Sequence, residues 1–149
     1  MLEILKRNKR IEIENLLEKN YGIKIPFKYH LIKAGKDKIR IFTGNLPAQD
    51  LRIMNKLLTI DIIGMYFAFF KDQKLRLSFD STTIFGKAAK NIIDLSDIEA
   101  RKWLKGQDLD KDIGIRGYIL LRYDSNILGC GKSTGKKILN FVPKERRIL

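Results

Sequence analysis

A segment rich in glycine and lysine holds the residues best suited to binding an anion. Three glycines alternate with three lysines in GCGKSTGKK, residues 129–137, and further cations follow up to residue 147. Glycine lets the backbone bend tightly or approach a ligand, so amide N–H groups and cationic side chains can meet phosphate together. The predicted phosphate-binding surface consists of Gly129, Gly131, Lys132, Gly135, Lys136, Lys137, Asn140, Lys144, Arg146 and Arg147.

A nucleotide-binding loop is the first alternative for this segment. Gly131-Lys132-Ser133 matches the end of the pattern GxxxxGK[ST], but Asn126 stands where that pattern needs its first glycine. The following KKILNFVP is rich in strand formers and ends in proline, which predicts no helix to hold a phosphate. The sequence also has no CxxC, HxxxH, GxSxG or glycine-rich S-adenosylmethionine loop. We therefore expect no catalytic residue, no metal site and no cofactor.

Single residues that invite a chemical role have simpler interpretations. The lone Cys130 allows no intrachain disulfide and is expected to fill the core in a reducing compartment. His30 is predicted to be a strand residue rather than a catalytic base, and Trp103 a core anchor rather than a base-stacking platform. DLDKD at 108–112 resembles a calcium loop only faintly, because Ile113 replaces the required glycine, so a solvated acidic loop is expected.

The elements around the glycine-lysine segment are predicted to be short strands. The apolar run 118–121, the turn formers 124–126 and a second run from Ile127 predict a hairpin, and residues 138–142 predict a third strand. Before them, Ser96 and Glu99 form a capping box, which predicts a helix that ends before Gly106.

The preceding 90 residues predict mixed helices and strands. Two helices are expected at 12–20 and 45–58, the second capped by Asn45 and burying Leu51, Met54, Leu57 and Leu58. A hairpin is expected from 29–34 and 38–43. Residues 60–70 predict a central strand and 74–79 a half-buried one with Lys74, Arg76 and Ser78 outward. Residues 81–91 are predicted to be a junction.

The basic cluster Lys6, Arg7, Lys9 and Arg10 is either a solvated helix flank or a secondary RNA contact.

The charge of the chain favours a polyanionic partner. The 149 residues carry a net charge of +13, which points to nucleic acid, with a membrane surface as the competing interpretation. Residues 125–149 hold six cations and one acid, whereas 94–124 hold six and seven. The longest apolar stretch is too short to span a membrane and the N-terminus does not match a signal peptide, so a cytoplasmic protein without membrane contact is expected.

The order of these features resembles the PUA family of RNA-binding domains. The resemblance rests on a short acidic helix ending WLKGQDL, then GYILL, LGCGK and ILNFVPKERR, and covers about residues 94–149. It is greatest to the PUA-like C-terminal domain of the Sun/Fmu-type RNA 5-methylcytosine methyltransferases. The family implies a small mixed pseudo-barrel that binds structured RNA and is usually attached to a modifying enzyme or a ribosome-assembly factor.

Together these observations predict an α+β protein of two units. Residues 1–90 would form a pre-PUA-like α/β domain, and residues 94–149 a PUA-like mixed β-barrel. The expected function is non-catalytic binding of structured rRNA or tRNA during maturation or ribosome assembly. The expected further partner is an RNA-modifying enzyme or assembly factor, since the sequence departs from the family in having no methyltransferase domain. The alternative is a protein adaptor that recruits a separate methyltransferase or assembly factor. An RNA-modifying enzyme ranks third.

Overall fold

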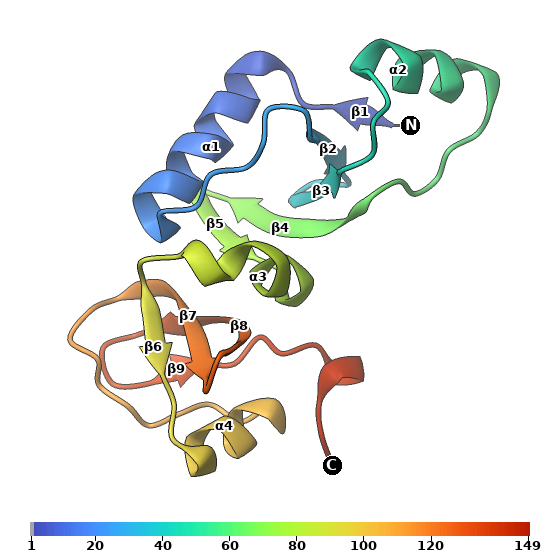
Figure 1. The fold of residues 1–149 in the computed structure, drawn as a ribbon. Helices are drawn as coiled ribbons and strands as arrows, with labels where there is room; N and C mark the ends of the chain where they lie inside the picture. Colours follow the sequence, from blue (N-terminus) through green and yellow to red (C-terminus); the bar gives the residue numbers. More distant parts are fainter. Residues whose placement is uncertain (1) are drawn as a thin grey trace.

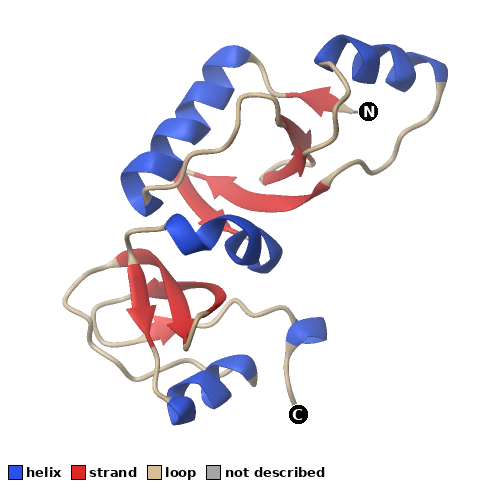
Figure 2. Cartoon of the chain, in the orientation of Figure 1, coloured by secondary structure: helices blue, strands red, loops and turns tan. Residues whose placement is uncertain are grey.

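The structure, a computed structural model, describes residues 2–149 and contains two β-sheets that follow one another in the chain (Figures 1 and 2). The first sheet is antiparallel throughout, in the order of the sequence. Its strands are β1 (Glu3–Ile4), β2 (His30–Ala34), β3 (Lys38–Phe42), β4 (Met65–Lys71) and β5 (Lys74–Leu77).

Helix α1 (Arg7–Tyr21) supplies the apolar layer on one face of this sheet. It buries Ile13, Leu17 and Tyr21 in one core cluster with residues of β2, β3, β4 and β5. The predicted helix 12–20 is therefore confirmed, but it begins five residues earlier. Arg7, Lys9 and Arg10 lie inside the helix rather than before it, and Lys9 and Arg10 pair with carboxylates of the same helix.

The second sheet is mixed and curled, as the PUA-like prediction requires. Strand β6 runs parallel to β7, and the remaining pairs are antiparallel. Its strands are β6 (Ile92–Asp94), β7 (Gly117–Tyr123), β8 (Asn126–Ser133) and β9 (Ile138–Leu139). The predicted hairpin is β7–β8, and the third strand is shorter than the predicted 138–142. The predicted α+β class is confirmed.

Helix α4 (Asp97–Leu104) has the predicted capping box and core anchor. The Ser96 hydroxyl accepts from the Glu99 amide at 3.2 Å, and the Glu99 carboxylate accepts from the Ser96 amide at 2.8 Å. Trp103 is fully buried, and its indole N–H donates to the Leu128 carbonyl at 2.7 Å. This ring therefore holds α4 against β8 and is not a stacking platform.

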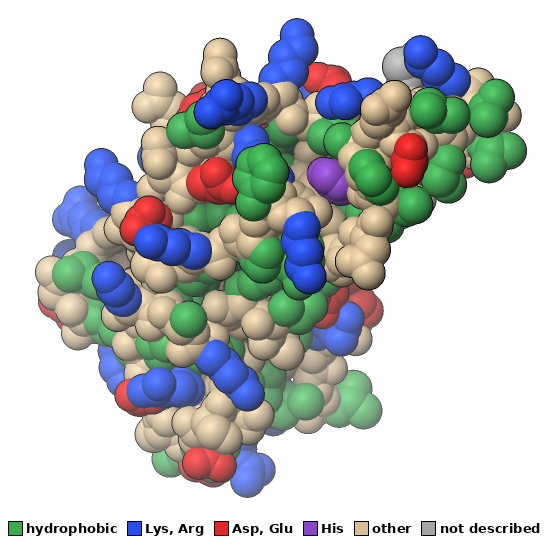
Figure 3. Space-filling view, turned by 45° about the horizontal axis from the view of Figure 1, so that its top comes forward, with side chains coloured by type: hydrophobic (Ala, Val, Ile, Leu, Met, Phe, Trp, Pro, Cys, Tyr) green, Lys and Arg blue, Asp and Glu red, His purple; other side chains and the backbone are tan. Residues whose placement is uncertain are grey.

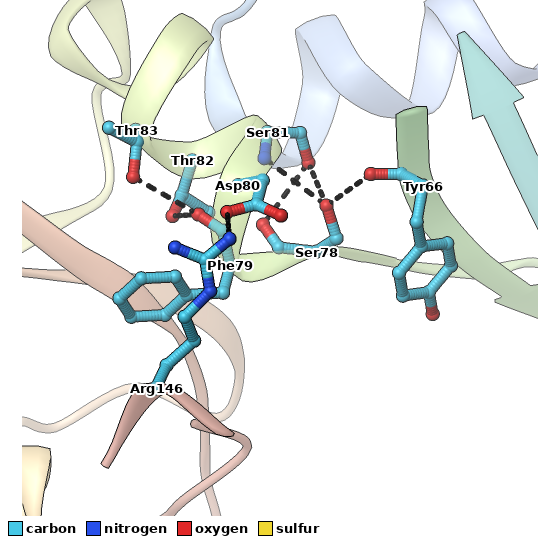
Figure 4. A network of polar contacts seen from close by, with 8 residues as sticks. All are labelled: Tyr66, Ser78, Phe79, Asp80, Ser81, Thr82, Thr83 and Arg146. Atoms are coloured by element: carbon cyan, nitrogen blue, oxygen red, sulfur yellow. Dashed lines mark hydrogen bonds and ion pairs between the residues drawn. The ribbon is translucent and has the colours of Figure 1, made fainter. Parts of the chain in front are cut away.

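The predicted junction contains a third helix rather than a loop. Helix α3 (Phe79–Phe85) and the short 3-10 turn η1 (Gly86–Ala88) lie between the sheets in Figure 1. Ser78 was expected to point outward, but it is buried and caps α3, accepting from the Ser81 amide at 3.1 Å. Ser78 also donates to the Tyr66 carbonyl of β4 at 2.6 Å (Figure 4). Ser81 donates to the Phe67 carbonyl of the same strand at 2.5 Å.

The apolar core continues from the first sheet into the second. Leu120, Ile127 and Cys130 of β7 and β8 belong to the cluster under α1. The Tyr21 hydroxyl donates to the Leu75 carbonyl at 2.6 Å and lies 3.7 Å from the Cys130 Sγ. The division predicted at residues 90–94 stays a prediction, but the two sheets share these core contacts.

The segment 45–64 departs most from the sequence-based expectation. Helix α2 (Ala48–Leu57) begins after Pro47, and of the four residues predicted to be buried only Leu51 is; Leu57 and Leu58 are 77% and 60% exposed. Residues 60–64 are irregular, and the strand starts at Met65. This strand, β4, lies between β3 and β5 and is an interior strand of the sheet, as predicted. Apolar side chains therefore gather on the surface at the α2 end of the molecule (Figure 3).

The described residues contain no helix long and apolar enough to cross a membrane. A short 3-10 turn, η2 (Lys144–Arg146), follows β9 near the C-terminal end.

Candidate nucleic-acid interface

Two of the predicted site glycines are interior residues. Gly129 and Gly131 are both buried in β8. A Cβ atom at Gly131 would lie 2.7 Å from Ile138 Cγ2 and 2.8 Å from Trp103 Cη2, and one at Gly129 would lie 3.0 Å from the Phe79 ring. These glycines let α3, α4 and β9 pack closely on β8, and Gly129 also lines a cleft of about 260 Å³.

Asn140 and Arg147 are also used inside the fold. The Asn140 amide donates to the Trp103 and Gln107 carbonyls at 2.7 and 3.0 Å, and its oxygen accepts from the Val142 amide at 2.8 Å. Arg147 donates through Nε to the Val142 carbonyl at 3.1 Å. Both side chains fix the segment after β9 against the end of α4.

The remaining predicted cations fall into two groups. Arg146 pairs with Asp80 of α3 at 2.8 Å, and Lys137 lies 3.9 Å from Asp110 (Figure 4 shows the first pair). Lys136 and Lys144 are exposed, without an ion pair in residues 2–149. Of the ten predicted residues, Gly129 and Arg146 line the cleft of about 260 Å³, and Lys132 lines a larger hollow in the surface.

This hollow, which we call the basic groove, is open and has a volume of about 820 Å³. Its cations come from four places in the fold: Lys19 from the last turn of α1, Lys74 from β5, Arg116 from the loop before β7 and Lys132 from β8. No aspartate or glutamate lines it. Within the described residues none of the four cations forms an ion pair.

Neighbouring residues hold two of these cations in place. Tyr118 lies opposite Lys132 in the β7–β8 pairing, and the Lys132 Nζ is 6.0 Å from the centre of its ring. The pKa of the Tyr118 hydroxyl is raised, mainly because this group is partly buried. Gly135 has φ +96°, and a Cβ atom there would lie 3.3 Å from Arg116 Nε, so the turn after β8 packs beside this guanidinium.

The groove has the chemistry of a phosphate site. Four cations without internal counter-ions repel one another, and a polyanion relieves that repulsion while it releases its own counterions. Asn91 adds a neutral polar group to the lining: its amide donates to the Tyr118 carbonyl at 2.9 Å, and its buried Oδ1 has no hydrogen-bond partner.

The other residues considered for chemistry have structural roles. Gly131-Lys132-Ser133 is part of β8, and β9 follows it, so the segment lacks the loop and helix of a P-loop. Cys130 is buried, and desolvation raises its thiol pKa to about 12. The His30 Nε2 lies 2.8 Å from the Leu46 carbonyl. Among the described residues no three His, Cys, Asp or Glu side chains are grouped to hold a metal ion.

The C-terminal part of the chain matches a known family. Residues 90–148 match the family model described as the methyltransferase RsmF PUA domain. With the mixed, curled sheet, this shows that the segment is a PUA-like domain related to the C-terminal region of Sun/Fmu-type RNA methyltransferases.

Its curated relatives are named ribosomal RNA small subunit methyltransferase F. The protein of Vibrio atlanticus is 35% identical over 66 residues, 44% of this chain and 14% of the relative. That of Aeromonas salmonicida is 27% identical over 132 residues, 87% of this chain and 26% of the relative. That of Aeromonas hydrophila is 29% identical over 101 residues, 66% of this chain and 21% of the relative. The similarity thus extends beyond the PUA-like part, while the chain spans about a quarter or less of these relatives.

Proposed function

We propose that this chain is a non-catalytic RNA-binding protein of rRNA maturation that holds the RNA backbone in the basic groove. The observation that carries the proposal is a set of four cations, without ion pairs or nearby carboxylates, on a chain that contains a PUA-like domain. The names of the relatives favour rRNA over tRNA as the ligand. Lys136 is an exposed lysine in the turn that packs beside Arg116.

A non-catalytic role is supported by the state of the side chains that usually do acid–base or nucleophilic chemistry. Burial keeps the Cys130 thiol protonated, with a pKa of about 12, whereas a nucleophilic cysteine needs a low pKa. His30 is stacked beside Phe42 at 6.3 Å between ring centres, and its ring nitrogen is engaged by a backbone carbonyl.

The first prediction replaces Lys74 and Lys132 together by alanine. Loss of two phosphate contacts should weaken binding of an rRNA stem-loop at least about tenfold, because hydrogen bonds to charged groups contribute about 1.5–3 kcal/mol each. The slope of log affinity against log salt should flatten by about 0.9 per lost contact, by analogy with duplex DNA. Fluorescence anisotropy at several salt concentrations measures both quantities.

The matched control replaces Lys24 and Arg101 by alanine. This variant also loses two positive charges. Lys24 and Arg101, however, are each paired with a carboxylate on the surface, at 3.4 and 2.9 Å. It should bind RNA within about threefold of the parent. Equal weakening of both variants would show that net charge, and not the groove, holds the RNA, and the proposal would then be wrong.

The exposed apolar surface of α2 favours one second candidate, an adaptor for a separate methyltransferase or assembly factor. Ile53, Leu57, Leu58 and Ile62 are between 46% and 77% exposed, an unusual concentration for a surface without a partner. The same anisotropy experiment separates the two functions. Absence of RNA binding in the parent protein, together with a stable complex with such an enzyme, would favour the adaptor.

A further inference from the structure

An aromatic surface adjoins the basic groove on the face of the first sheet opposite α1. Leu75 and Leu77 of β5 belong to the core under α1, so the alternation of a strand places Arg76 on the other face. Phe69 of β4 is the register partner of Arg76. The Arg76 Cζ lies 5.2 Å from the centre of the Phe69 ring and 4.1 Å from that of Phe141, which follows β9.

A cleft of about 260 Å³ opens beside this guanidinium. Tyr66, Arg76 and Phe141 line it, and all three residues are partly exposed. The Asp80–Arg146 ion pair, visible in Figure 4, also lines the cleft and offers both an acceptor and donors. Arg76 itself forms no ion pair in the part of the chain that the structure describes. We call Tyr66, Arg76 and Phe141 the stacking cleft.

The stacking cleft continues the basic groove. Phe141 lies 6.4 Å from Tyr118 between ring centres, and Tyr118 lines the groove beside Lys132. Lys74 and Arg76 are two residues apart in β5, so they project from the same face of the sheet. One cation of this strand thus lies in the groove and the next in the cleft. A bound RNA strand could place a phosphate in the basic groove and the base of the same nucleotide in the stacking cleft.

Bases can use such a cleft only when they are unpaired. RNA-binding proteins stack splayed bases on aromatic rings or guanidinium planes and read their edges with polar groups, whereas bases inside a duplex are not accessible in this way. We propose that the stacking cleft binds an unpaired base of RNA whose phosphates lie in the basic groove. The ligand is therefore a single-stranded segment, such as a loop, bulge or flank. This inference rests on the proposed function and specifies its ligand.

The test compares two single strands of equal length and charge, an oligouridylate and an abasic ribose-phosphate oligomer. The parent protein should bind the strand with bases at least about fivefold tighter, since stacking contributes about 1–3 kcal/mol per base. Phe141→Leu keeps an apolar side chain but removes the ring, and it should reduce this preference to near unity. The control Phe27→Leu changes an 88% exposed ring beside Arg10 and should keep the full preference.

A second variant and a crosslinking experiment complete the test. The groove variant of Lys74 and Lys132 should weaken both strands alike, which supports separate roles for groove and cleft. In the parent, 4-thiouridine should crosslink to Tyr66, Arg76 or Phe141, a readout that needs no folded variant. Equal binding of both strands by the parent, or crosslinks only elsewhere, would overturn the inference while the proposed function stands. Binding of neither strand nor of the stem-loop would refute the proposed function first.

Discussion

At the scale of residues, the alternation of β8 explains why the glycine-lysine segment is only partly a binding surface. Gly131 and Lys132 are neighbours, but successive side chains of a strand point to opposite faces. Gly131 faces Trp103 and Ile138, while Lys132 faces Tyr118 and the groove. The sequence motif alone placed both on the RNA surface. The fold gives the first a packing role and keeps the second as a cation of the groove.

Gly131→Ala should therefore destabilise the protein without changing its contacts with RNA. The added Cβ would lie well inside van der Waals distance of Trp103 and 3.2 Å from the Leu139 carbonyl, and overpacking of a core costs about 1–3 kcal/mol. Urea unfolding measures this loss. The affinity of the folded variant for RNA, measured at low temperature, should match the parent. A stable variant with weak RNA binding would instead mean that Gly131 contacts the ligand.

Three of the four groove cations have no signal in the sequence. Lys19, Lys74 and Arg116 are isolated cations from segments far apart in the chain. Only folding brings them beside Lys132, because α1, β5 and the β7–β8 hairpin meet at the shared core. The net charge predicts a polyanionic partner as a class of ligand, but charge counted along the chain gives no position in space.

At the scale of elements, local signals predicted helices well where the relevant contacts are local. The Ser96–Glu99 capping box lies within four residues and was found from the sequence. Helix α3 was missed because its serine and threonine residues are also turn formers. The hydroxyl groups of its N-cap residue Ser78 and of Ser81 donate to carbonyls of β4 that are 12 and 14 residues away in the sequence. Helix α2 was predicted, but the predicted burial of Met54, Leu57 and Leu58 was wrong, since periodicity does not show whether a partner surface exists.

Ser78→Ala should test the contribution of α3. Loss of an N-cap costs about 0.5–2 kcal/mol, and Ser78 also donates to Tyr66 from a buried position. We expect a decrease of about 2 kcal/mol in the free energy of unfolding. Probes placed in the two sheets should report the same urea midpoint. Thr83→Ala removes an exposed hydroxyl of the same helix and should stay within about 0.5 kcal/mol of the parent. Equal effects of the two would contradict the capping role.

At the scale of the whole molecule, the α+β class and the PUA-like second half were predictable, but the way the halves join was not. The strand and turn signals of residues 118–128 predicted the β7–β8 hairpin, whose register only the structure shows. The contact between Tyr21 and Cys130 joins positions 109 residues apart, which no local pattern encodes. This shared core positions the basic groove, because Lys19 and Lys74 come from the first half and Arg116 and Lys132 from the second.

The central claim, that the basic groove holds RNA, is tested most directly by lysine footprinting. The protein is treated with an amine-reactive reagent with and without saturating rRNA stem-loop, and the modification of each lysine is measured by mass spectrometry. Lys19, Lys74 and Lys132 should lose most of their reactivity in the complex, while the ion-paired surface residue Lys24 should keep it. Protection confined to the lysines of residues 136–144, with the groove lysines unchanged, would contradict the account.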